Sequence, residues 1–174
     1  ALGISSEIWL DNIGNKILIR QGEYLDDLIF AYNLIEMSDN VRLQEIKSLL
    51  INQINNLCFN IYEQYYSPYI QVKAWKARWN NPKDVIGKNE SALSEDLRLF
   101  KKYCEMRGQQ KNKYDEIIEF ATCEFFNAEE LSELQLMVLQ EMYDKEIVIE
   151  TLPTSNVMIG HHRSYSSYHI YNWL

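Results

Sequence analysis

The stretch Val41–Tyr66, VRLQEIKSLLINQINNLCFNIYEQYY, sets the fold class of this chain. Its apolar residues recur at spacings of three and four, the period of an α-helix with one apolar face. The residues on this face are Leu43, Ile46, Leu50, Ile54, Leu57, Ile61 and Tyr65. Such a helix spans ~40 Å, and its apolar face must pack against a partner in this chain or in a neighbouring one. We expect Pro68 to end the helix.

Helical patterns flank this segment on both sides, so we expect a mainly α fold with one or two short strands. Further helices are predicted over residues 24–37, 69–79, 94–107, 113–126 and 127–143. Asn127, followed by Glu130 three residues later, resembles a capping box at the start of the last helix. The other predicted features are a strand at Lys16–Arg20, a turn at Gln21–Gly22 and a loop over residues 82–93.

The period changes at Glu146–Leu152, EIVIETL, which is rich in β-branched residues and predicts a short buried strand. A helix leading directly into such a strand is half of an α/β unit. The small polar residues Thr154, Ser155 and Asn156 follow this strand. In a parallel α/β barrel, binding and catalytic groups lie at the carboxyl ends of the strands. The same residue types also form turns and cap helices, so the residues alone leave both interpretations open.

The composition excludes several classes of protein. The chain has 17 basic and 25 acidic residues, a formal net charge of −8, and no basic stripe. This balance argues against nucleic acid as the primary partner. Since the sequence has no run of about 18 apolar residues, we expect no membrane span. Cys58, Cys104 and Cys123 are widely spaced and odd in number, which favours reduced thiols and a cytoplasmic location.

Three other groups of residues have an interpretation that needs no chemistry. The histidines at 161, 162 and 169 lack the spacing of zinc ligands on one helix, so we expect no metal site from them alone. Asp26 and Asp27 point about 100° apart on a helix, which favours a solvated first turn over a shared catalytic pair. Trp75 and Trp79 could stack on a base, but a core or subunit contact is the better interpretation.

One segment resembles a known family. Ile147–Asn156, IVIETLPTSN, resembles the seventh strand of adenosine deaminases and related metal-dependent amidohydrolases, which reads like IEICPTSN. Leu152 stands where that family usually has Cys. Met158–Tyr168, MIGHHRSYSSY, and Gln21–Tyr32, QGEYLDDLIFAY, are most similar to the adenosine deaminases of bacterial RADAR antiphage defence systems. Leu2-Gly3-Ile4 resembles the phrase that follows the metal-binding His of strand six.

This resemblance implies a segment of a (β/α)8 TIM-barrel hydrolase with a helical insertion. Residues 1–37 would be the barrel helix region after strand six, residues 38–126 the insertion, and residues 127–174 the barrel helix, strand seven and the following loop and helix. The chain would then lie inside a longer protein, between the metal-binding His of strand six and an Asp–Asp pair of strand eight.

The implied activity is hydrolytic deamination of adenosine or an adenine nucleotide to the inosine form, by a zinc-bound water with a Glu as proton shuttle. No position here matches the zinc ligands, the Glu or the Asp, so the resemblance implies no catalytic residue and no metal ligand in this chain. Zinc would belong to the parent enzyme. Thr154, Ser155 and Asn156 would line or support the substrate pocket, with His161 at its rim.

The resemblance also implies a large homo-oligomer and an ATPase partner, with the helical middle as the natural place for those contacts. The alternative is of another class: an independent all-α interaction or regulatory module without catalysis, in which the strand-like pattern at residues 146–152 is incidental.

Overall fold

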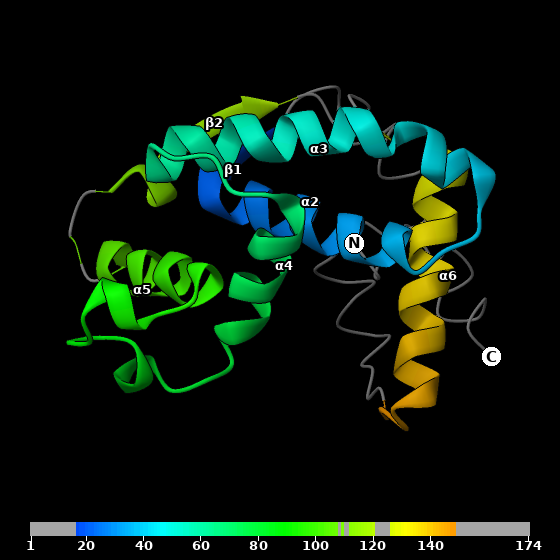
Figure 1. The fold of residues 1–174 in the computed structure, drawn as a ribbon. Helices are drawn as coiled ribbons and strands as arrows, with labels where there is room; N and C mark the ends of the chain where they lie inside the picture. Colours follow the sequence, from blue (N-terminus) through cyan, green and yellow to red (C-terminus); the bar gives the residue numbers. More distant parts are fainter. Residues whose placement is uncertain (1–16, 108, 110–111, 121–125, 149–174) are drawn as a thin grey trace, which may run out of the picture. The chain divides into compact units, whose positions relative to one another are not determined.

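The computed structural model describes residues 17–107, 109, 112–120 and 126–148 (Figure 1). Its helices and strands, in chain order, are β1 (Ile17–Arg20), α2 (Gln21–Glu36), α3 (Val41–Tyr62), α4 (Pro68–Ala77), η1 (Pro82–Asp84), η2 (Glu90–Ala92), α5 (Glu95–Arg107), η3 (Lys113–Asp115), β2 (Ile117–Phe120) and α6 (Ala128–Asp144), where η marks a short 3-10 helix. The expected mainly α class with short strands is confirmed. Within the described residues, every helix is too short or too polar to cross a bilayer.

The chain divides into two compact units, and each is described by itself. Residues 17–120 form one unit, which runs from β1 through β2. The other unit comprises residues 1–16 and 121–174, and its described helix is α6. The division into barrel segments and an insertion, with boundaries after residues 37 and 126, stays a prediction.

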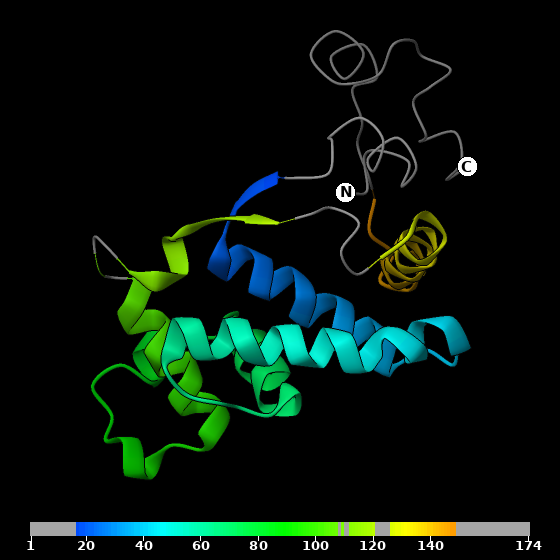
Figure 2. The same ribbon diagram turned by 90° about the horizontal axis from the view of Figure 1, so that it is seen from above.

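Helices α2 and α3 pack side by side in the core of the 17–120 unit (Figures 1 and 2). Their buried side chains are mostly aliphatic, and include Leu25, Leu28, Ile29, Leu34 and Ile35 on α2 and Leu43, Leu50, Ile54, Leu57 and Ile61 on α3. Asn40 caps α3, because its Oδ1 accepts hydrogen bonds from the amides of Arg42 and Leu43 at 3.0 and 3.3 Å. Five of the seven residues predicted on the apolar face of α3 are buried within this chain. Ile46 is half-buried, and Tyr65, which follows the end of the helix, is exposed.

The end of α3 differs from the prediction. The helix ends at Tyr62, and Glu63 follows in the left-handed conformation with φ 57°. This conformation turns the chain away from the helix axis while the Glu63 amide still donates to the Phe59 carbonyl at 2.8 Å. Pro68 does not end α3; it is the first residue of α4, where its missing N–H costs nothing, and Ser67 is the cap.

The two strands form an antiparallel ribbon in which Ile17 lies opposite Phe120. This pairing corrects the helix predicted over residues 113–126, because residues 117–120 are a strand. The β-branched side chains that begin β2 fit a strand better than a helix. Since the partner strand lies near the other end of the unit, no local period in the sequence could reveal it.

Helix α2 begins directly after β1, which corrects the turn predicted at Gln21–Gly22. The backbone N–H of Gln21 donates to the carbonyl of Glu116 at 2.8 Å, and its side-chain amide donates to the carbonyl of Lys113 at 2.7 Å. These bonds take the place of a side-chain cap, which Arg20 does not supply. The first turn of α2 is thereby fastened to the segment that leads into β2.

Helices α4 and α5 pack against each other and are joined by the segment 78–94. The loop predicted over residues 82–93 contains two 3-10 turns, η1 and η2. Val85 and Leu93 are buried and anchor this otherwise exposed segment. The helix predicted from Ser94 to Arg107 is confirmed, with Ser94 directly before α5.

The capping box predicted at the start of α6 is confirmed: Asn127 accepts from the Glu130 amide at 3.0 Å, and the Glu130 carboxylate accepts from the Asn127 amide at 2.8 Å. The strand predicted over residues 146–152 is not found in its described part. Glu146, shortly after the end of α6, has φ 54°, a left-handed backbone conformation that interrupts both a helix and a strand. Val148 is exposed, not buried as the predicted strand would require. The remaining residues of that predicted strand lie outside the described residues.

Gly22 makes a close approach possible between α2 and η3. A Cβ atom at this position would lie 2.3 Å from ring atoms of Tyr114. Tyr114 is buried, and its ring packs directly on the first turn of the helix. No side chain larger than hydrogen fits between them.

We therefore expect Gly22→Ala to lower the free energy of unfolding by about 1–3 kcal/mol, as over-packing does. Urea denaturation measures this. Without a clash the same substitution in a helix would stabilise by about 0.5–1 kcal/mol. In a Tyr114→Leu background the loss should therefore shrink or change sign; an equal loss in both backgrounds would contradict the assigned contact.

Candidate functional site

The residues that the resemblance assigned to the substrate pocket, Thr154, Ser155, Asn156 and His161, all lie outside the described residues. The other two histidines, at 162 and 169, lie outside them as well. Among the residues that the structure does describe, no three His, Cys, Asp or Glu side chains are grouped as metal ligands would be. The most concentrated polar chemistry lies instead inside the 17–120 unit.

This polar cluster is centred on Asp26 of α2. Arg78 donates from Nη1 to Asp26 Oδ2 at 2.5 Å, and the Tyr114 hydroxyl donates to the same oxygen. The side chains of Arg78 and Asp26 are only 16% and 21% exposed. The prediction that Asp26 and Asp27 form a solvated first turn is thus wrong. Helix α2 begins at Gln21, so both residues lie beyond its first turn, and Asp26 faces a cation from the end of α4. Asp27 is exposed.

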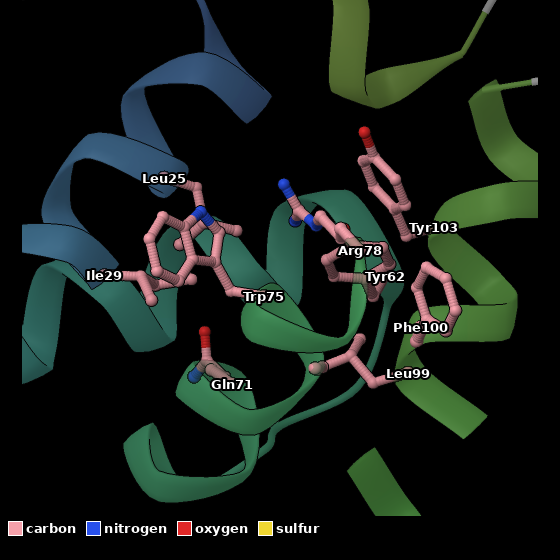
Figure 3. A pocket seen from close by; sticks show the side chains of 10 residues that line it. Leu25, Ile29, Tyr62, Gln71, Trp75, Arg78, Leu99, Phe100 and Tyr103 are labelled. Carbon is pink, nitrogen blue, oxygen red and sulfur yellow. The ribbon is translucent and has the colours of Figure 1, made fainter. Parts of the chain in front are cut away.

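Aromatic rings surround the Arg78 guanidinium. Its central carbon lies 3.8 Å from the centre of the Tyr103 ring and 5.8 Å from that of Tyr114. The two rings meet edge to face, with centres 5.4 Å apart. Figure 3 shows Arg78, Tyr103 and Tyr62 grouped on one side of the cavity, with Arg78 at the end of α4 and Tyr103 on α5. This stacking stabilises a cation that is otherwise withdrawn from water.

The fold brings each member of the cluster from a different element. Arg78 is the residue that ends α4, where a positive charge complements the negative end of the helix dipole. Tyr114 comes from η3, and its ring packs against Gly22. Tyr103 lies on α5. The cluster therefore joins α2, α4, α5 and the turn that precedes β2.

The protonation states of Arg78 and Tyr114 are fixed near neutral pH. Burial and the neighbouring Asp26 carboxylate raise the pKa of Tyr114 above its usual range. Burial, the largest single influence, lowers the pKa of the Arg78 guanidinium. Attraction to Asp26, Tyr62 and Tyr114, together with the hydrogen bond to Asp26, outweighs burial and raises that pKa. Neither group gains or loses a proton at physiological pH. The arrangement is therefore suited to holding elements together and not to acid–base catalysis.

A small cavity lies beside this cluster, with a volume of about 10 Å³ (Figure 3). Its walls include Ile29, Gln71, Trp75 and Phe100. Pockets for small-molecule ligands measure about 300–1,000 Å³, so this cavity is too small for a nucleoside. Gln71 is held in place by a 2.8 Å hydrogen bond from its amide nitrogen to the Tyr66 carbonyl.

A larger groove of about 380 Å³ lies between the end of α3, α5 and η3. It is open to solvent, and lysines and glutamates occur together along it. Lys113 donates to Glu63 at 2.7 Å, and Lys102 donates to the Gln64 side chain at 2.8 Å. Because two lysines and two glutamates line the groove, it has no net charge with which to select a charged ligand.

The two tryptophans considered together from the sequence separate in the structure. Trp75 packs against Phe30, with ring centres 5.9 Å apart, and lines the small cavity. Trp79 is 84% exposed. The core interpretation thus holds for Trp75 and not for Trp79.

Sequence reasoning did not identify Arg78 as a central residue. Its position offered one signal, because it follows the buried Ala74 and Ala77 at the end of α4. A cation on the apolar side of a helix needs a buried partner. The sequence did not show which of the chain's acids would supply it.

Comparison with models of known protein families and with curated proteins finds no match for this chain.

The ion pair makes a testable contribution to stability. Removing one partner leaves a buried charge uncompensated, so Asp26→Asn and Arg78→Met should each lower the free energy of unfolding by about 3 kcal/mol. The double variant should lose less than the sum of the two, with a coupling of about 1 kcal/mol or more. Urea denaturation of all the variants gives these values.

The matched control is the exposed pair Arg20–Glu23, whose side chains are each 50% exposed. Glu23→Gln should cost at most about 1 kcal/mol. A loss for Asp26→Asn no greater than that of Glu23→Gln would show that the Asp26–Arg78 pair is not a structural connection.

Proposed function

We propose that this chain is part of an adenosine-deaminase-like zinc hydrolase that converts adenosine or an adenine nucleotide to the inosine form in antiphage defence. The sequence support is the resemblance at Ile147–Asn156 and Met158–Tyr168 to the strand and following loop of that family. In this proposal the parent fold is a (β/α)8 barrel, and the helical unit of residues 17–120 is inserted into it.

One geometric observation supports the proposal that residues 17–120 are an inserted domain. The unit begins at Ile17 and finishes at Phe120, and these two residues are directly opposite each other in the β1–β2 ribbon. A domain can be inserted into a host without disturbing it when its two ends lie side by side. The insertion proposed from this geometry begins at residue 17 and not at residue 38, because α2 packs with α3.

Zinc has no proposed ligand among the described residues, since none of their His, Cys, Asp and Glu side chains form a suitable group of three. No step of the reaction is assigned to them. The proposal gives Thr154, Ser155 and Asn156 a place beside the adenine substrate and His161 a place at the rim of that pocket. The homo-oligomer and the ATPase partner belong to the same proposal, with the helical unit as the contact region.

The alternative function is that of an all-α interaction module without catalysis. The observation that favours it is the independence of the 17–120 unit, which has its own buried core and closes on itself through the ribbon. Such a unit can serve as a binding domain in many proteins, with or without a barrel beside it.

The test uses the complete reading frame that contains this chain. The purified protein, loaded with zinc, should convert adenosine or ATP to the inosine product, and chelation of the metal should abolish the conversion. Asn156→Ala should lower kcat/KM about tenfold or more, as loss of a substrate contact does. Asn89→Ala, the same change at the cap of η2, should leave the rate unaltered.

Two results would contradict the proposal. A folded, zinc-loaded parent protein with no activity on either substrate would favour the interaction module. Turnover by the 174-residue chain alone would show that the metal ligands are not supplied from elsewhere.

A further inference from the structure

The solvent-facing side of α4 combines aromatic rings with lysines. Tyr69, Lys73 and Lys76 recur at spacings of four and three and are all exposed, so they share one face of the helix. The opposite face carries the buried Gln71, Ala74 and Ala77. Trp79 follows at the end of the helix. We name Tyr69, Lys73, Lys76 and Trp79 the lysine–tryptophan surface.

Trp79 is exposed on an ordered turn. Its side chain is 84% exposed, the highest value among the large hydrophobic side chains of the 17–120 unit. The turn is fixed by backbone bonds, from the Asn80 amide to the Ala77 carbonyl at 2.9 Å and from the Asp84 amide to the Asn81 carbonyl at 2.9 Å. The backbone therefore presents the indole ring to solvent at a defined position, which favours a binding role over loose packing.

The local charge is positive although the whole chain is acidic. Residues 73–88 include five basic residues, Lys73, Lys76, Arg78, Lys83 and Lys88, and one acidic residue, Asp84. Arg78 is already paired with Asp26, so the four lysines are the basic side chains of this segment that could contact a ligand. From the neighbouring α5, the carboxylate that acts on Lys73 is Asp96. Across the described part of the chain, no ion pair involves Lys76, Lys83 or Lys88.

The surroundings of Trp79 indicate what kind of partner fits. A tryptophan that anchors a protein partner is usually enclosed by a ring of contacts that exclude water. Along the turn after Trp79, Asn80, Asn81 and Lys83 are polar and exposed, and Pro82 among them is exposed as well. A base needs only the face of an aromatic ring, and its phosphates need cations nearby.

We propose that the lysine–tryptophan surface binds single-stranded nucleic acid, with Trp79 and Tyr69 stacking on bases and the lysines contacting phosphates. The two aromatic residues are ten positions apart, and the helical part between them, Tyr69 to Ala77, spans about 12 Å. One face of the Tyr69 ring is already covered by Lys73, whose Nζ lies 4.5 Å from the ring centre. Trp79 is therefore the stronger stacking residue. The proposal is independent of the deaminase activity and goes beyond it.

The experiment measures binding of the full 174-residue chain to fluorescein-labelled oligo-dT and oligo-U by fluorescence anisotropy. Dissociation constants of about 10⁻⁶–10⁻⁴ M are expected at physiological salt. Two or three phosphate contacts predict a slope of about −1.4 to −2.1 for log K against log salt concentration. Trp79→Ala should weaken binding about tenfold or more, since stacking on one base is lost. Lys76→Gln should also weaken it and reduce the salt slope.

The controls repeat each change elsewhere on the chain. Tyr143→Ala removes another strongly exposed aromatic ring, 80% exposed on α6, and Lys47→Gln removes a lysine on α3. Both should bind as the unaltered chain does, and circular dichroism checks that every variant is folded. Duplex DNA should bind more weakly than the single strand, because its bases are already stacked.

Several results would overturn the proposal. They are no binding at a chain concentration of about 10⁻⁴ M, the upper end of the expected dissociation constants, equal affinity for duplex and single strand, or an unchanged affinity of the Trp79→Ala variant. Competition by poly-glutamate with the same dependence on Trp79 would assign the surface to an acidic protein partner instead. All of these readouts are independent of deamination, so failure here and failure of the proposed activity are distinguishable.

Discussion

The ion pair between Asp26 and Arg78 is the interaction on which the packing of residues 17–120 depends. A charge largely withdrawn from water must have a close partner, because an unpaired one costs several kcal/mol. Here each charge comes from a different helix, and the Tyr114 hydroxyl adds a third element to the same carboxylate oxygen. Because the two charges and the hydroxyl come from three elements, the cluster ties α2, the end of α4 and η3 to one another.

The same constraint extends to the ends of the unit. Tyr114 lies on Gly22 at the start of α2, and the Gln21 amide and side chain bond to the carbonyls of Glu116 and Lys113. These contacts place the segment before β2 beside the end of β1, from which the ribbon follows. A two-stranded ribbon is only marginally stable alone. The two strands therefore depend on their attachment to α2 for stability.

Sequence patterns predicted the parts of this fold that depend on neighbouring residues. The period of α3 and the cap at Asn127 are local signals, and each was confirmed. The strand β2 was predicted as a helix because its partner is distant in the sequence. The start of α2 was predicted as a turn because its cap is the backbone of a remote residue, Glu116.

The polar cluster was missed for the same reason, since Asp26 and Arg78 acquire their meaning only once α2 and α4 meet. Exposure of Trp79 could not be read from helical spacing either, because the helix ends just before it. The residues assigned by resemblance, Thr154, Ser155, Asn156 and His161, lie outside the described residues and stay predictions.

The central claim is that residues 17–120 are a self-contained unit closed by the β1–β2 ribbon. The most direct measurement is solution NMR with thermal unfolding on residues 17–120 produced alone. We expect one cooperative unfolding transition and a nuclear Overhauser contact between Ile19 and Ile118, which are paired in the ribbon. An unfolded chain, or a folded helical core without that contact, would contradict it.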